Sequence, residues 1–217
     1  MRTSLRRSTK CRIEISGLYA ITPEASDTAA LLRQVRPALQ GGATTLQYRN
    51  KTGDAVLRLE QAIALRRLTQ EFAVPLIIND DAALAAQVDA DGVHLGFDDG
   101  SVAAARAVLG NEKIIGVSCY NRIVLAHQAA AQGADYVAFG AFFASNIKPD
   151  AVAATPDLLR QARREIALPI AAIGGITIEN GASLLDAGAD ALAVISALFG
   201  AEDIAHAAKQ FSNLYNP

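Results

Sequence analysis

Short apolar runs alternate with longer amphipathic segments along most of the chain. The runs are rich in β-branched residues and are bounded by glycine or polar residues, so each predicts a buried strand. The predicted strands span residues 18–22, 44–49, 76–79, 92–95, 114–118, 136–140, 170–173 and 192–196. Between them, apolar residues recur with helical spacing, as at Leu32, Val35 and Leu39. The pattern therefore predicts eight strands that alternate with eight helices.

The predicted strands are near-continuous apolar runs rather than alternating ones, which is typical of a parallel sheet covered by helices on its faces. Eight strand–helix units in about 200 residues fit an α/β fold, a single closed (β/α)8 TIM barrel. The alternative is an open doubly wound sheet, but no GxGxxG follows the first strand and the strands are evenly spaced. We predict one barrel domain over residues 15–217, and we expect Pro37 to kink the first helix or end it early.

Composition and charge narrow the class of protein further. With 217 residues, 51% of them hydrophobic, the chain can form a sizeable core, and overall disorder is excluded. The longest stretch without a charged residue, 166–178, is shorter than the roughly 20 residues of a membrane helix. A net charge of -2 gives no general attraction to phosphate backbones. We therefore expect neither a nucleic-acid partner nor a membrane.

The cysteines and the N-terminus predict a cytoplasmic location. Cys11 and Cys119 form no disulfide framework and lack the spacing of a zinc site. The first twelve residues contain five basic residues and no acid, and no apolar segment follows them, which argues against a secretory signal. We interpret residues 1–14 as a loose basic arm; an anion-binding or assembly tail is the alternative.

The residues that follow the strands are candidates for chemistry, because this fold builds its sites at the C-terminal ends of the strands. After the second strand, alternation sends Gln47, Arg49 and Lys51 to one side, where an amide and two cations can hold a polyanion. The alternative for these charges is simple solvation at a strand end.

Acidic residues follow the third and fourth strands. Mg2+ commonly needs only one or two carboxylates besides substrate phosphates, so Asp80 and Asp99 could share one ion. Alternatively, Asp81 and either Asp98 or Asp99 cap the next helices. His94 lies inside an apolar strand, which favours a hydrogen-bonded core histidine over a catalytic base.

The last three strands predict a phosphate site and a lid. Loops after strands seven and eight often bind phosphate, and here they contain Gly174-Gly175 and Ser196. Strand six opens onto a long segment, residues 140–149, which could carry Ser145 and Lys148 over the site. The alternative is a surface loop whose phenylalanines pack on the barrel.

Taken together, these strand ends resemble the thiamine phosphate synthase family, also called thiamine-phosphate pyrophosphorylase, over residues 17–198. The resemblance rests on QYRNK at 47–51, NDD at 79–81, DGVHLG at 91–96 with Asp99 following, GVSCYN at 116–121, GADYVAFGAFF at 133–143, AIGGIT at 172–177 and VISAL at 194–198. Each motif is weak alone, but their order at successive strand ends is specific.

The resemblance implies a transferase of thiamine biosynthesis with small-molecule substrates. Such an enzyme condenses 4-amino-5-hydroxymethyl-2-methylpyrimidine diphosphate with hydroxyethylthiazole phosphate, or its carboxylated form. The products are thiamine phosphate and pyrophosphate, formed by a dissociative, Mg2+-assisted mechanism.

The resemblance also implies a set of site residues. The pyrimidine diphosphate would be bound by Gln47, Tyr48, Arg49, Asn50, Lys51, Asn79, Ser118 and Lys148. Of these, the catalytic residues would be Arg49, Lys51, Ser118 and Lys148. The metal ligands would be Asp80 and Asp99. The thiazole phosphate would be bound by Ser145, Asn146, Ile147, Gly175, Ile195 and Ser196.

Three positions depart from the family pattern. Ala144 replaces a proline and Ile147 a threonine in the strand-six loop, and Phe97 replaces a glutamine. Ile147 lacks a hydroxyl that would contact the thiazole phosphate. Two other functions remain alternatives: a thiazole tautomerase, which does not need the diphosphate cations and metal carboxylates kept here, and a non-catalytic barrel that binds thiazole or thiamine phosphate. The sequence leaves a homo-oligomer open.

Overall fold

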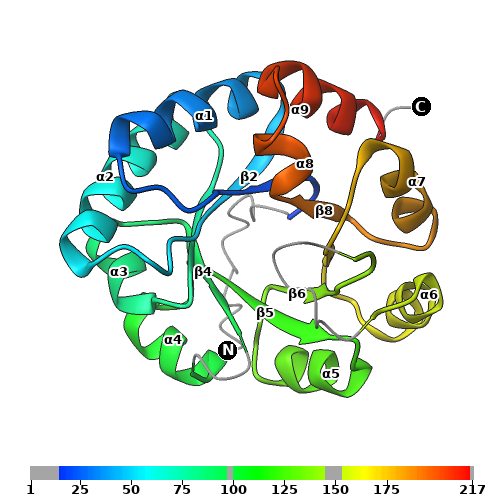
Figure 1. The fold of residues 1–217 in the computed structure, drawn as a ribbon. Helices are drawn as coiled ribbons and strands as arrows, with labels where there is room; N and C mark the ends of the chain where they lie inside the picture. Colours follow the sequence, from blue (N-terminus) through cyan, green and yellow to red (C-terminus); the bar gives the residue numbers. More distant parts are fainter. Residues whose placement is uncertain (1–14, 97–99, 145–152, 216–217) are drawn as a thin grey trace, which may run out of the picture.

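The computed structural model describes residues 15–96, 100–144 and 153–215, which form a closed barrel of eight parallel strands in the order β1 to β8. Seen along the barrel axis, the strands form an inner ring and the helices an outer one (Figure 1). The strands are β1 (Gly17–Ile21), β2 (Ala43–Tyr48), β3 (Leu76–Asn79), β4 (Gly92–Leu95), β5 (Ile114–Tyr120), β6 (Tyr136–Phe139), β7 (Ile170–Ile173) and β8 (Ala191–Val194). The predicted TIM barrel is confirmed. The predicted basic arm, residues 1–14, lies outside the described residues.

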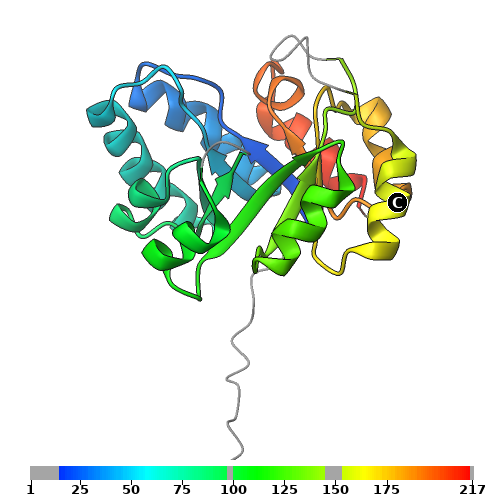
Figure 2. The same cartoon turned by 90° about the horizontal axis from the view of Figure 1, so that it is seen from below.

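The described residues contain one helix more than the pattern predicts. The helices are α1 (Thr28–Gln40), α2 (Ala55–Glu71), α3 (Ala82–Gln87), α4 (Val102–Leu109), α5 (Ile123–Ala131), α6 (Pro156–Glu165), α7 (Ile178–Asp186), α8 (Ser196–Phe199) and α9 (Ile204–Asn213). The extra one is α8, a single turn directly after β8. In the side view, α8 and the loop between β1 and α1 lie at the same end of the barrel (Figure 2).

Pro37 does not end α1 early, so of the two expected effects of this proline, a kink or an early end, the early end is wrong. The helix runs through the proline to Gln40, and the N–H of Gly41 donates to the carbonyl of Pro37 at 2.9 Å. The proline costs one backbone hydrogen bond in the last turn. Ala38 and Leu39, which follow Pro37 in that turn, are buried, and their burial favours continuing the helix.

A repeated contact closes the N-terminal end of the barrel. Three aspartates each accept the N–H at or near the start of the preceding strand and pair with an arginine of the helix before that strand. The sets are Asp91 with Leu76 and Arg66, Asp135 with Ile115 and Arg106, and Asp190 with Ile170 and Arg163. These contacts are structural and lie away from the strand ends where chemistry is expected.

The inside of the barrel is filled by side chains, as expected for this fold. Ile15, Tyr19 and Tyr136 are each at most 1% exposed and belong to one interior cluster. Tyr136 reaches the centre because the neighbouring strand has Gly116, where a Cβ would lie 2.0 to 2.4 Å from atoms of the tyrosine ring and hydroxyl. A filled interior leaves the C-terminal rim as the place for a site.

Candidate active site

Three polar side chains at the end of β2 reach three different partners. Gln47 is 3% exposed and donates from Nε2 to the Tyr19 hydroxyl at 2.8 Å. The Arg49 guanidinium lies 3.1 Å from Oε1 of Glu24. Lys51 Nζ lies 3.0 Å from Oδ2 of Asp80, at the end of β3. The strand therefore brings an amide and two cations to the C-terminal rim.

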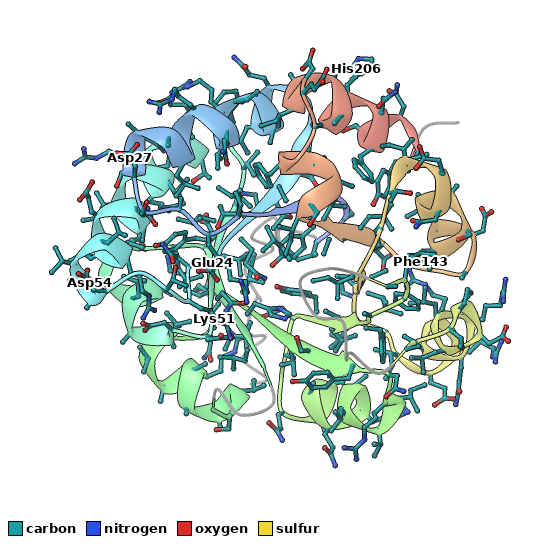
Figure 3. All side chains as sticks on the ribbon, in the orientation of Figure 1. Glu24, Asp27, Lys51, Asp54, Phe143 and His206 are labelled. Carbon is teal, nitrogen blue, oxygen red and sulfur yellow. The ribbon has the colours of Figure 1, made fainter. Side chains whose placement is uncertain are left out.

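Glu24 is a rim residue that the sequence analysis missed. Its Oε2 accepts hydrogen bonds from the Thr52 hydroxyl at 2.6 Å and the Thr52 N–H at 3.1 Å. The Thr52 hydroxyl is the main cause that lowers the pKa of Glu24, with backbone N–H groups and the Arg49 charge acting in the same direction. Figure 3 shows Glu24 and Lys51 inside the ring of helices, on the side of α2 and α3. The only feature of the sequence that could have indicated Glu24 as a rim residue is its position just after the first strand, because a single acidic residue forms no motif.

Tyr48 and Asn50 turn to the helix side of β2. The Tyr48 hydroxyl donates to Oε1 of Gln61 on α2 at 2.8 Å, and burial raises the pKa of Tyr48 to about 12. Asn50 donates from Nδ2 to the same Gln61 oxygen and to the carbonyl of Ala25. Its Oδ1 accepts the N–H of Gly53 at 2.9 Å. These side chains fix the loop that carries Lys51.

A cavity of about 230 Å³ opens at the ends of β2 and β3. It is lined by Tyr48, Asn50, Lys51, Arg58, Ile78, Asn79, Asp80 and Leu84. Asp80 has a positive φ of 64° and donates its N–H to the carbonyl of His94 at 2.8 Å. A non-glycine residue in that conformation is uncommon, and it turns this carboxylate back toward Lys51. An anion and a cation thus share one edge of the cavity.

Asp81 has a different environment from its neighbour. Its Oδ1 accepts the N–H of Leu84 at 2.8 Å and so caps α3, and its Oδ2 pairs with Arg58 at 2.7 Å. The predicted capping role is confirmed for Asp81.

His94 is a hydrogen-bonded core histidine, as predicted. Its Nδ1 lies 2.8 Å from the Tyr136 hydroxyl and its Nε2 lies 2.8 Å from Oγ of Ser118. Burial lowers the pKa of His94 to about 4, although the Asp80 charge acts in the opposite direction. The Tyr136 hydroxyl also lies 2.7 Å from that of Tyr19. Ser118 is thereby connected through the barrel to the two tyrosines, which the sequence analysis did not single out.

Gly175 is required by the backbone around it. A Cβ at this residue would lie 2.5 Å from the carbonyl oxygen of Ala144 and 2.7 Å from that of Phe143. The N–H of Phe143 donates to the Gly174 carbonyl at 3.0 Å. The sequence analysis assigned this glycine to a phosphate, and the close approach of residues 143–144 is a second reason for it.

The start of α8 lies on the same rim. Ile195 precedes the helix and accepts the N–H of Phe199 at 2.9 Å, while Ser196 is exposed. The first N–H groups of a helix have no acceptor within it. The turn therefore offers a hydroxyl and backbone donors at the end of β8, which is separated from β2 by β1.

Several predicted residues lie outside the described ranges: Phe97, Asp98, Asp99, Ser145, Asn146, Ile147 and Lys148. The pairing of Asp80 with Asp99 and the lid therefore stay predictions. At the start of the segment after β6, Phe142 is buried and Phe143 packs against the same core, as the surface-loop alternative expects for the phenylalanines. Figure 3 shows Phe143 across the barrel from Lys51.

Within residues 15–96, 100–144 and 153–215, no group of three or more histidine, cysteine, aspartate or glutamate side chains could hold a metal ion. None of the helices in this part of the chain has the length and apolar character needed to cross a membrane.

Comparison with known proteins shows which family the chain resembles over most of its length. Residues 18–198 match the family model described as thiamine monophosphate synthase. The chain is 58% identical over 202 residues to the thiamine-phosphate synthase of Methylobacillus flagellatus, covering 93% of this chain and 96% of that protein. It is 54% identical over 210 residues to the enzyme of the same name from Nitrosospira multiformis, covering 97% and 90%. The solved thiamine phosphate pyrophosphorylase from Pyrococcus furiosus superposes with a TM-score of 0.83 at 35% identity, covering 92% and 95% of the two chains.

Proposed function

The chain belongs to the thiamine monophosphate synthase family, and from this premise we propose how its C-terminal rim carries out the reaction. The protein is a transferase of thiamine biosynthesis that condenses a pyrimidine and a thiazole moiety into thiamine phosphate. Its substrates are small molecules. We propose that they are 4-amino-5-hydroxymethyl-2-methylpyrimidine diphosphate and hydroxyethylthiazole phosphate or its carboxylated form. We also propose that the enzyme is cytoplasmic.

The diphosphate binds at the ends of β2 and β3 in this proposal. The observation that carries it is the cavity edge at which Lys51 and Asp80 face each other at 3.0 Å. Arg49 adds a second cation from the same strand, and a planar guanidinium can grip two phosphate oxygens at once. The other residues proposed to contact the pyrimidine diphosphate are Gln47, Asn79, Ser118 and Lys148. Tyr48 and Asn50 contribute indirectly, because they fix the loop that carries Lys51.

Asp80 and Asp99 would hold Mg2+ in this scheme. The donor set fits, because a carboxylate on the cavity edge with a cation as its partner can exchange that partner for a metal ion. Mg2+ usually needs one or two carboxylates and completes its shell with substrate phosphates and water. When bound, the ion supplies positive charge that stabilises the leaving pyrophosphate.

The proposed chemistry breaks one bond and forms one. The bond between the pyrimidine methylene carbon and the pyrophosphate oxygen breaks, and its electron pair leaves with pyrophosphate. The lone pair of the thiazole nitrogen then forms the new bond to that carbon. Arg49, Lys51 and Lys148 stabilise the charge that develops on the leaving group. No protein nucleophile is needed, and no proton has to be removed for either bond change.

The thiazole phosphate binds at a different part of the C-terminal rim from the diphosphate, between the turn after β7 and the start of α8. The residues in the proposal are Ser145, Asn146, Ile147, Gly175, Ile195 and Ser196. The exposed Ser196 hydroxyl and the backbone donors of α8 support it, because phosphate oxygens accept such hydrogen bonds. Ile147 offers no hydroxyl to the phosphate, so we expect this half of the site to bind more weakly than a threonine version would.

An omission assay tests the proposal. Purified protein is mixed with both substrates and Mg2+, and pyrophosphate is measured with each component left out in turn. We expect release only in the complete mixture, and we expect a chelator to abolish it. Conversion of the thiazole without the diphosphate would instead support a tautomerase, and ligand-induced thermal stabilisation without turnover would support a binding protein.

A further inference from the structure

Five side chains form a continuous hydrogen-bonded chain through the centre of the barrel. It runs from Gln47 on β2 to Tyr19 on β1, Tyr136 on β6, His94 on β4 and Ser118 on β5, with successive distances of 2.8, 2.7, 2.8 and 2.8 Å. The two tyrosines are at most 1% exposed, and His94 is 7% exposed. Both ends of the chain are residues proposed to bind the pyrimidine diphosphate, whereas the three middle residues are not among those proposed to contact the diphosphate or the thiazole phosphate.

The direction of donation along this chain is fixed at its first link. The Gln47 amide nitrogen can only donate, so the Tyr19 oxygen accepts there and uses its one proton toward Tyr136. Tyr136 in turn uses its proton toward Nδ1 of His94. That nitrogen therefore carries no hydrogen, and the ring proton lies on Nε2, which donates to Ser118.

The chain leaves one free group of opposite character at each end. Gln47 keeps Oε1 as an acceptor, and Ser118 keeps its hydroxyl proton as a donor. In the part of the chain that the structure describes, neither group has another partner. Among the described residues, the buried side-chain polar atoms without a partner are Thr45 Oγ1 and Arg66 Nε. Oε1 of Gln47 has no partner among these residues and is not one of the two buried atoms, so it is accessible from the rim. The rim thus presents a fixed acceptor on β2 and a fixed donor on β5.

We propose that Tyr19, Tyr136 and His94 are positioning residues that hold this polarity and so make the site select a 4-aminopyrimidine over its 4-oxo counterpart. The inference rests on the proposed binding of the pyrimidine at Gln47 and Ser118. An exocyclic amino group donates to Oε1 of Gln47, and a ring nitrogen accepts from the Ser118 hydroxyl. A 4-oxo group would place a second acceptor against Oε1.

The chain matters because an amide alone discriminates poorly. A glutamine side chain can rotate its amide by half a turn and exchange its acceptor for its donor. Here that rotation would set Oε1 against the Tyr19 oxygen, whose proton is already used toward Tyr136, and the buried bonds beyond it would have to reverse. Rotation of Gln47 alone would leave buried polar groups unpaired, which is costly, so the amide can turn only if the Tyr19, Tyr136 and His94 bonds all reverse with it.

The test compares two inhibitors that cannot release pyrophosphate: the 4-amino and the 4-oxo forms of 5-hydroxymethyl-2-methylpyrimidine monophosphate. We expect wild type to bind the amino form at least about 10-fold more tightly. Tyr136→Phe removes one hydroxyl from the middle of the chain and keeps the ring. In this variant we expect the amino-to-oxo ratio of inhibition constants to fall by about 3-fold to 10-fold, equivalent to about 0.7 to 1.4 kcal/mol.

Inorganic pyrophosphate and a matched tyrosine separate positioning from a general structural loss. Pyrophosphate carries no pyrimidine, so its inhibition constant should not change in Tyr136→Phe. Tyr215→Phe also removes a hydroxyl with two hydrogen bonds, to Gly17 and Leu192 at the other end of the barrel, and should leave the ratio unchanged. Tyr19→Phe breaks the chain beside Gln47 and provides a second variant with the same expected fall.

The outcomes distinguish the inference from the function it rests on. Wild-type turnover is measured first, and its absence would refute both. Turnover with an unchanged ratio in Tyr136→Phe and Tyr19→Phe would overturn only the positioning role, as would equal weakening of pyrophosphate and both pyrimidines. A wild-type preference for the oxo form would show that the chain has the opposite polarity.

Discussion

Lys51 on the β2 rim and Asp80 on the β3 rim lie with Nζ 3.0 Å from Oδ2, and this pair joins a proposed diphosphate cation to a proposed metal ligand. The Lys51 side chain is 53% exposed and that of Asp80 is 23% exposed. Ion pairs this open contribute at most about 1 kcal/mol, so substrate and metal can replace the contact at small cost. The pair is therefore suited to separate when a diphosphate and its metal ion bind between the two side chains.

Asp80→Ala should remove most Mg2+-dependent turnover and change the melting temperature by only a few degrees, because the carboxylate holds an open ion pair and no helix cap. Asp81→Ala is the matched control. It removes the cap of α3 and the Arg58 pair, so we expect a loss of about 1 kcal/mol in unfolding free energy with turnover retained. Thermal melts and pyrophosphate release measure both effects. Near-normal turnover in Asp80→Ala would move the metal elsewhere.

Arg49→Ala should raise KM for the pyrimidine diphosphate and lower kcat, because the same cation meets the bound diphosphate and the charge that develops on it. Arg49→Lys should recover only part of the loss, since a point charge cannot replace a bidentate fork. Arg36→Ala removes an exposed arginine paired with Glu71 on the outer helices and should leave both constants unchanged. Steady-state kinetics with each substrate varied in turn measures KM and kcat. Unchanged values for the diphosphate in Arg49→Ala would exclude this arginine from the anion site.

The stability of the protein should depend on His94 in acid. Its pKa is about 4 in the folded state, mainly through burial, and near 6.5 when unfolded. The unfolded chain therefore binds an extra proton between these values, and unfolding free energy is lost as pH falls from 6.5 to 4, by about 3 kcal/mol in total. His94→Gln does not titrate and should lose less between pH 7.5 and 5.0, by about 2 kcal/mol, in urea unfolding. Parallel losses in the two proteins would contradict this.

Gly116→Ala should destabilise the barrel, because the added methyl group would meet the Tyr136 ring and hydroxyl at 2.0 to 2.4 Å. Overpacking of this kind usually costs about 1 to 3 kcal/mol. Urea unfolding of the variant measures it. An unchanged midpoint would mean that the interior can shift the tyrosine at no cost.

The fold was predictable because its signals are local. Most strands are near-continuous apolar runs, and every predicted strand end lies within two residues of the observed one. The missed features depend on packing instead. The continuation of α1 past Pro37 needs the burial of Ala38 and Leu39, and the single turn of α8 was hidden in an apolar run with no capping motif.

The candidate site could be predicted only where its residues come in motifs. Gln47, Arg49 and Asp80 stand out because they end strands, whereas Glu24 is one acid in a loop. Tyr19 and Tyr136 are 117 residues apart and meet only when β1 and β6 face each other across the barrel. Contacts of this kind depend on barrel closure, so local sequence cannot indicate them.

The most direct measurement is the stoichiometry of the two products. A limiting amount of the pyrimidine diphosphate is incubated with excess thiazole phosphate, Mg2+ and enzyme until reaction stops, and pyrophosphate and thiamine phosphate are both quantified. The account predicts one thiamine phosphate for each pyrophosphate and for each diphosphate consumed. Pyrophosphate without an equal amount of thiamine phosphate, or altered thiazole phosphate with no pyrophosphate, would contradict it.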